Sequence, residues 1–172
     1  SYHRTMPAAR RPNPPERASD VASAKAALRA EIRRSRRLAE PLEQRQARIA
    51  SALRLSLPHR VLALYCSTGD EPDTWQLLDA LAAAGRTVLL PVLGRRADGT
   101  VRHDPDWAAY SGREALRVGY AGIAEPVSEP QGPQGLGSAT LIWCSALAAS
   151  PAGDRLGTGG GWYDRALAYA AS

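Results

Sequence analysis

The sequence contains no phenylalanine, a single lysine and only two cysteines in 172 residues. Two cysteines are too few for a disulfide framework, and Cys66 and Cys144 each end an apolar run, so we expect buried free thiols in a reducing cytoplasm. No run of 18 apolar residues is present, so we expect no membrane-spanning helix. The arginines near the start lead into prolines rather than an apolar region, so we expect no secretory signal.

What is present is ordinary for a globular protein, with 44% hydrophobic and 23% charged residues. The length fits one domain, because domains commonly have ~100–200 residues. Residues 1–18 are rich in proline and arginine and show no periodicity, which predicts a disordered tail. We therefore predict a single domain over residues 19–172, working as a monomer.

The net charge of +5 is unevenly distributed. Residues 21–60 carry ten basic and three acidic groups, whereas residues 61–172 carry eight basic and twelve acidic groups. Such asymmetry indicates contact with an anion, either a nucleic acid or a small polyphosphate. Because all basic residues except Lys25 are arginine, a pattern typical of a GC-rich coding bias, the arginine count alone does not favour nucleic acid.

Periodicity predicts two helices at the start of the domain. The first begins near Ser19 or Asp20 and ends before Pro41, and the second covers residues 42–55. Within the first helix, apolar residues occupy one face and basic residues a second. The apolar positions are Val21, Ala24, Leu28 and Ile32, and the basic ones are Lys25, Arg29, Arg33, Arg36 and Arg37.

Three short apolar runs, residues 61–66, 87–93 and 140–144, predict buried parallel strands. A helix over 75–84 separates the first two, and this strand–helix–strand order is typical of an α/β sheet. Further predictions are a hairpin turn at 97–100, an irregular loop over 119–137 and a last helix over 162–171. The fold class is therefore α/β with a mostly parallel sheet.

A glycine-rich segment, residues 153–165, carries the strongest chemical signal. Five glycines in nine residues let the backbone approach a ligand and turn its N–H groups toward an anion, and a helix start beyond them favours phosphate. Arg155 can bond phosphate oxygens in a bidentate manner, and Asp164 can hold Mg²⁺. The alternative is a flexible connection that binds nothing. The segment is neither a Walker A loop nor a dinucleotide fingerprint.

Two further patterns indicate ligand contacts. Lys25 and Arg29, spaced i, i+4 on a helix, can grip one anion together, although a solvated basic face is the alternative. Glu71 follows the first strand and can accept bonds from N–H donors of a substrate ring. Its neighbours Asp73 and Thr74 are interpreted as caps of the next helix. Trp107 and Tyr110 either stack on a heterocycle or pack in the core.

The three signals occur together in one family. From about residue 22 to its end, the chain resembles the 5-formyltetrahydrofolate cyclo-ligases, also called methenyltetrahydrofolate synthetases. The matching elements are Lys25-Ala26-Ala27-Leu28-Arg29, the strand 61–66 with Glu71-Pro72-Asp73-Thr74, Leu90-Pro91, Gly122-Ile123-Ala124-Glu125-Pro126, and the signature from Gly153 to Arg165. That last signature, Gly-x-Arg-Leu-Gly-x-Gly-x-Gly-x-Tyr-Asp-Arg, is highly specific.

The resemblance implies a three-layer α/β/α sandwich and a ligase of folate metabolism. It would convert 5-formyltetrahydrofolate into 5,10-methenyltetrahydrofolate with ATP and Mg²⁺, through a phosphorylated formyl group. The implied catalytic residues are Lys25, Arg155 and Tyr163. The implied ATP-binding residues are Lys25, Ala26, Ala27, Leu28, Arg29, Arg155, Leu156, Gly157, Thr158, Gly159, Gly160, Gly161, Trp162 and Tyr163. The implied folate-binding residues are Arg29, Cys66, Glu71, Thr158, Gly159, Gly160, Gly161 and Trp162, and the implied metal ligand is Asp164.

The chain departs from the family pattern at several places. Many members have proline where Ser145 stands and a Phe-Asp pair at Ala149-Ser150. The family continues beyond Tyr-Asp-Arg with another strand and a second acidic metal ligand, and we expect this chain to lack that segment.

A second hypothesis is a catalytically impaired protein of the same fold that binds an anion or nucleic acid. The acidic character of residues 61–172 favours the enzyme over a nucleic-acid partner.

Overall fold

The computed structural model describes residues 14–36, 40–96 and 98–170, so residues 1–13 of the predicted tail lie outside it. The first helix, α1, spans Pro14–Arg36 and therefore begins before the predicted Ser19 or Asp20. Proline is compatible with a first helical turn, because its φ is already helical and the missing N–H would have no partner there. Pro14 and Pro15, interpreted from the sequence as part of a tail, thus begin a helix.

A four-stranded sheet forms the centre of the molecule. Its strands are β1 (Val61–Ala63), β2 (Thr87–Pro91), β3 (Trp107–Ala109) and β6 (Leu141–Ile142), in the order β3-β2-β1-β6. β1 pairs in parallel with both β2 and β6, whereas β3 is antiparallel to β2. The predicted mostly parallel sheet is confirmed, with shorter strands, and the predicted turn lies in the β2–β3 hairpin, where Gly99 N–H donates to the Arg96 carbonyl.

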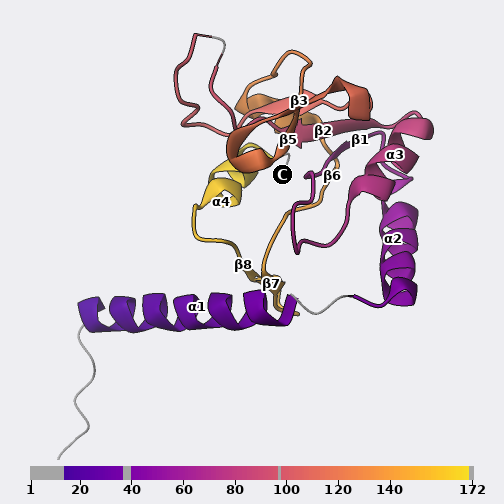
Figure 1. Ribbon diagram of the computed structural model, residues 1–172. Helices are drawn as coiled ribbons and strands as arrows, with labels where there is room; N and C mark the ends of the chain where they lie inside the picture. The colour runs from indigo at the N-terminus through magenta and orange to yellow at the C-terminus, as the bar shows by residue number, and fades with distance from the viewer. Residues whose placement is uncertain (1–13, 37–39, 97, 171–172) are drawn as a thin grey trace, which may run out of the picture.

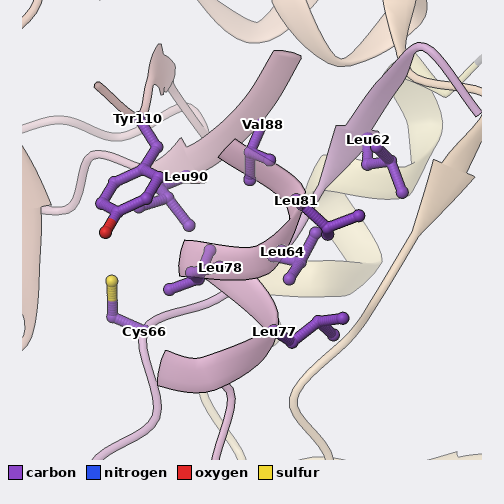
Figure 2. Close-up of a cluster of buried hydrophobic side chains, with 9 residues drawn as sticks. All are labelled: Leu62, Leu64, Cys66, Leu77, Leu78, Leu81, Val88, Leu90 and Tyr110. Carbon is purple, nitrogen blue, oxygen red and sulfur yellow. The ribbon is translucent and has the colours of Figure 1, made fainter. Parts of the chain in front are cut away.

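Alternating side chains of the strands divide the core between the two faces of the sheet. On one face Leu62 and Leu64 pack beneath α2 (Leu42–Ser56) and α3 (Trp75–Ala83), as Figure 2 shows for the residues around α3. On the other face Ala63 packs with side chains from η3 (Pro133–Ser138) and α4 (Trp162–Ala166). Helices on both faces give the three layers that the resemblance implied.

The two aromatic residues with alternative interpretations both pack in this core. Trp107 is fully buried on the η3 and α4 face, and Tyr110 is buried against α3. At the start of α3, Asp73 accepts a hydrogen bond from the Trp75 N–H at 2.9 Å, as a cap does. Thr74 stands at the N-cap position as predicted, but its side chain makes no capping bond, because its hydroxyl donates to the Tyr65 carbonyl at 2.7 Å instead.

Several short elements were not predicted. Residues 119–137 are not an irregular loop, because they include η2 (Tyr120–Gly122), β5 (Ala124–Pro126) and η3, and β5 pairs with β4 (Leu116–Val118), which follows η1 (Arg113–Ala115). A second antiparallel pair, β7 (Ala148–Ala149) and β8 (Arg155–Leu156), separates β6 from the glycines. The last helix is divided into α4 and η4 (Leu167–Tyr169).

Figure 1 shows α1 lying along one end of the molecule beside the β7–β8 pair. The predicted apolar face is not buried there, since Val21 and Leu28 are 53% and 45% exposed. Arginine contacts hold the helix instead: Arg36 Nη2 donates to the carbonyls of Ala146 and Leu147 at 2.6 and 2.8 Å. Within the described residues, every helix is too short or too polar to cross a membrane.

Candidate functional site

The glycine-rich segment meets the basic helix through one side chain. Arg29 Nε donates to the Gly157 carbonyl at 2.9 Å, across 128 residues of sequence. An added Cβ at Gly159 would lie 3.9 Å from the Arg29 guanidinium carbon. Two of the three predicted ligand-binding segments are therefore neighbours, and Arg29 keeps its terminal nitrogens for an anion.

The backbone of this segment favours glycine at three positions, of which Gly153, with a φ value of 92°, lies in the turn between β7 and β8. Gly159 and Gly161 have φ values of 116° and 63°, which L side chains rarely adopt. Gly161 directly precedes α4, which has only five residues, so the predicted contribution of a helix start to phosphate binding is weak. Exposed glycine backbone, rather than a helix dipole, is what the loop offers to a ligand.

Arg155 and Asp164 pair across the loop. Arg155 Nη2 lies 2.8 Å from Asp164 Oδ1, and its guanidinium carbon lies 5.9 Å from the centre of the Tyr163 ring. The Asp164 side chain is 80% exposed, so the pair opens readily to solvent and to ligands. Arg155, Tyr163 and Asp164, which the sequence assigned to the site, therefore lie in one cluster.

A single carboxylate is available here for the implied Mg²⁺. Within residues 14–36, 40–96 and 98–170, no group of three His, Cys, Asp or Glu side chains could hold a metal ion. One carboxylate suffices when substrate phosphates and water complete the octahedral shell, which is how Mg²⁺ is commonly bound with nucleotides. Asp164, exposed beside the glycines, fits that role.

Glu71 is the best-anchored acid of the site. Its Oε2 accepts from the Thr68 N–H at 2.9 Å and from the Thr68 hydroxyl at 3.2 Å, and its Oε1 accepts from the Ser145 hydroxyl. It lines a cavity of about 200 Å³ together with Arg33, Ser145 and Thr158. The loop after β1, the loop after β6 and the glycine-rich segment therefore share one cavity.

Cys66 and Trp162 occupy positions in or against the core. Cys66 is 3% exposed within the cluster of Figure 2, and burial raises the pKa of its thiol to about 12. Trp162 packs on Trp107, with ring centres 5.2 Å apart. Tyr163 is half-buried, and burial raises the pKa of its hydroxyl. Neither Cys66 nor Trp162 lines the cavity around Glu71.

The remaining predicted residues of α1 face solvent. Lys25, Ala26, Ala27 and Leu28 are exposed, with Lys25 one helical turn before Arg29. Arg29 is thus the member of the predicted Lys-x-x-Leu-Arg element that contacts the glycine-rich segment. The helix places Lys25 on the same side by its i, i+4 spacing.

Sequence reasoning did not assign several of the polar residues that line this cavity to the site. Arg33 and Arg36 line it from α1, and Thr68 and Ser145 line it from the two loops that hold Glu71. The arginines belong to the basic face of the helix, so the spacing from Arg29 could have found them. No sequence signal marked Thr68. Ser145 stood out only as a departure from the family pattern, because its contact with Glu71 joins loops 74 positions apart in the chain.

A larger hollow lies apart from these residues. It measures about 880 Å³ and runs from the loop after β2 to the β4–β5 pair. The buried Glu125 accepts there from the N–H groups of Leu93 and Gly94 at 2.8 and 2.6 Å. None of the predicted site residues lines it. Glu125 of the predicted Gly-x-Glu-Pro element is thus a structural residue that joins two loops.

Comparison with known proteins shows the family. Residues 21–172 match the 5-formyltetrahydrofolate cyclo-ligase family model. A 5-formyltetrahydrofolate cyclo-ligase of Mycolicibacterium smegmatis is 35% identical over 118 residues, which are 69% of this chain and 60% of that protein. One of Haemophilus influenzae is 31% identical over 145 residues, which are 81% of this chain and 75% of that protein.

A solved structure agrees with this assignment. The NMR structure of Aquifex aeolicus 5,10-methenyltetrahydrofolate synthetase matches with a TM-score of 0.66 and 26% identity, over 85% of this chain and 73% of that one. The chain spans about 60% of the length of the Mycolicibacterium relative. Since the family model covers all but the first twenty residues, the chain belongs to the 5-formyltetrahydrofolate cyclo-ligase family.

Proposed function

We propose that the protein converts 5-formyltetrahydrofolate into 5,10-methenyltetrahydrofolate with ATP and Mg²⁺. One observation carries the proposal: Thr158 of the glycine-rich segment lines the same cavity as Glu71. A phosphate-binding backbone and an acceptor for ring N–H groups therefore adjoin each other. That is the arrangement needed to bring a nucleotide phosphate to a folate ring.

The reaction needs an activated formyl oxygen. The formamide oxygen attacks the γ-phosphorus of ATP, and ADP leaves. The N10 nitrogen then attacks the activated formyl carbon, its proton goes to solvent, and the C–O bond breaks to release phosphate. ATP and 5-formyltetrahydrofolate thus give ADP, phosphate and the methenyl product. Such chemistry asks the protein for positioning and for neutralisation of phosphate charge.

The residues of the site divide these tasks. The guanidinium groups of Arg29 and Arg155 and the backbone N–H groups of the glycines neutralise charge on the phosphates. Lys25 adds a further cation on the same helix. Glu71 accepts hydrogen bonds from the ring and sets its orientation. When bound at Asp164, Mg²⁺ supplies charge neutralisation for the phosphate oxygens.

Variants test these roles through the near-ultraviolet absorbance of the methenyl product. We expect Lys25→Ala and Arg155→Ala each to lose at least about tenfold in kcat/KM for ATP, the value of one hydrogen bond to a charged group. Arg54→Ala, an exposed arginine on α2, is the matched control and should leave the constant unchanged. Wild-type kinetics in both site variants would show that these residues do not bind ATP.

The nucleic-acid hypothesis has its own test. A fluorescent oligonucleotide titrated with the protein at increasing salt would show affinity that falls steeply if backbone phosphates are bound. We expect no such binding at physiological salt, because residues 61–172 carry twelve acidic against eight basic groups and offer no continuous basic surface to a nucleic-acid backbone.

A further inference from the structure

Ser145 lies where two loops of the site meet. It belongs to the loop between β6 and β7, and its hydroxyl donates to Oε1 of Glu71, which lies in the loop between β1 and α3. The two residues are 74 positions apart in the chain, and both are half-buried. The bond is therefore a contact between loops, made where the cavity is formed.

Counting acceptor sites shows what this bond does to Glu71. A carboxylate has about four lone-pair sites, two on each oxygen. The Thr68 N–H and hydroxyl engage Oε2, and the Ser145 hydroxyl engages Oε1. One site on Oε1 is left for a ligand. The carboxylate is thus held by donors on both oxygens, and its plane is fixed by two different loops.

Ser145 also bears on Tyr163. Burial raises the pKa of the Tyr163 hydroxyl, and the backbone of Ser145 acts against that effect. The residue therefore lies between an acid and a phenol that were both assigned to the site from the sequence. Proline, which the resemblance implies at this position in many members of the family, has no hydroxyl and cannot donate to Glu71.

We propose that Ser145 is a positioning residue for reduced folate, whose hydroxyl fixes the Glu71 carboxylate so that one oxygen accepts from the N–H groups of the ring. This inference rests on the proposed function and deepens it. Binding of the folate, and not of ATP, should therefore depend on Ser145.

Three variants separate the two ligands. We expect Ser145→Ala to raise the KM and the Kd for 5-formyltetrahydrofolate by about tenfold, the value of one hydrogen bond to a charged group, while the KM for ATP stays unchanged. Ser145→Thr keeps a hydroxyl and should restore affinity to within about threefold of wild type. Ser138→Ala, an exposed serine of η3 that bonds only a local carbonyl, is the matched control.

The Kd is measured by quenching of tryptophan fluorescence, and a thermal melt checks that each variant folds. Unchanged folate affinity in Ser145→Ala overturns the inference, as does a loss that Ser145→Thr fails to restore or that affects ATP equally. A wild-type protein that binds no 5-formyltetrahydrofolate overturns the proposed function itself. The two failures are thus distinguishable, because the second appears without any substitution.

Discussion

Arg29 has two tasks that a lysine cannot perform together. Its Nε donates to the Gly157 carbonyl at 2.9 Å, which leaves the two terminal nitrogens of the guanidinium for a phosphate. A lysine ammonium is a point donor on a flexible stem, so it reaches either the carbonyl or the phosphate. Arg29→Lys therefore keeps the charge and loses one of the two contacts, whereas Arg29→Ala loses both.

The size of the effect follows from the number of bonds lost. A hydrogen bond that involves a charged group contributes about 1.5–3 kcal/mol, and the half-buried position of Arg29 favours the lower end. About 1.4 kcal/mol is tenfold in an equilibrium constant. We therefore expect kcat/KM for ATP to fall about tenfold in Arg29→Lys and about a hundredfold in Arg29→Ala.

Steady-state kinetics with ATP varied at saturating 5-formyltetrahydrofolate measure the effect. Arg34→Lys, an exposed arginine on the same helix, is the matched control and should behave as wild type. Wild-type kinetics in Arg29→Lys would refute the reasoning, because the division of the guanidinium between Gly157 and phosphate would then have no role.

Three predictions concern stability and reactivity. Glu125→Ala leaves three partly buried backbone N–H donors, those of Leu93, Gly94 and Tyr120, without their acceptor, so the free energy of unfolding from urea titration should fall by about 2–5 kcal/mol. The exposed Glu129→Ala should stay within about 0.5 kcal/mol of wild type, and a loss below about 1 kcal/mol in Glu125→Ala would contradict the prediction. The hydrogen bond with Arg113 is the main cause that lowers the pKa of Asp79 in the folded protein. Its contribution to stability is therefore complete above the unfolded pKa near 4 and is lost as the pH falls through the lower folded pKa. Asp79→Asn should flatten the fall of unfolding free energy at acid pH, and an unchanged fall would show that the Asp79–Arg113 pair does not contribute to it. Burial raises the pKa of the Cys66 thiol to about 12. In a variant that lacks Cys144, iodoacetamide at pH 8.5 should therefore modify Cys66 only after the protein is denatured. Rapid labelling of the native protein would contradict the place of Cys66 in the core.

Much of the central fold could be predicted from local patterns. Runs of Val, Leu and Ile predicted three of the four strands of the main sheet, because strands buried on both faces read as continuous apolar segments. The helix predicted over 75–84 is α3, which spans Trp75–Ala83. The pairs β4–β5 and β7–β8 were missed, since two or three residues such as Ala148-Ala149 carry no periodicity and form strands only through their partners.

For the site, the sequence predicted the residues but not their arrangement in space. The glycines, Arg29, Arg155, Glu71 and Asp164 belong to local motifs, so the sequence named them before the structure placed them. Their mutual arrangement depends on tertiary contacts, such as the hydrogen bond from Arg29 to Gly157. The exposed apolar side of α1 contradicted its periodicity, because the helix is held at its basic side by backbone carbonyls rather than packed into the core.

The central claim is tested most directly by formation of the methenyl product. The full chain is incubated with 5-formyltetrahydrofolate, ATP and Mg²⁺, each omitted in turn, while absorbance and released phosphate are followed together. The account predicts product only when all three are present, with one phosphate released per product formed. Absence of product from the folded chain, or product that forms without ATP, would contradict it.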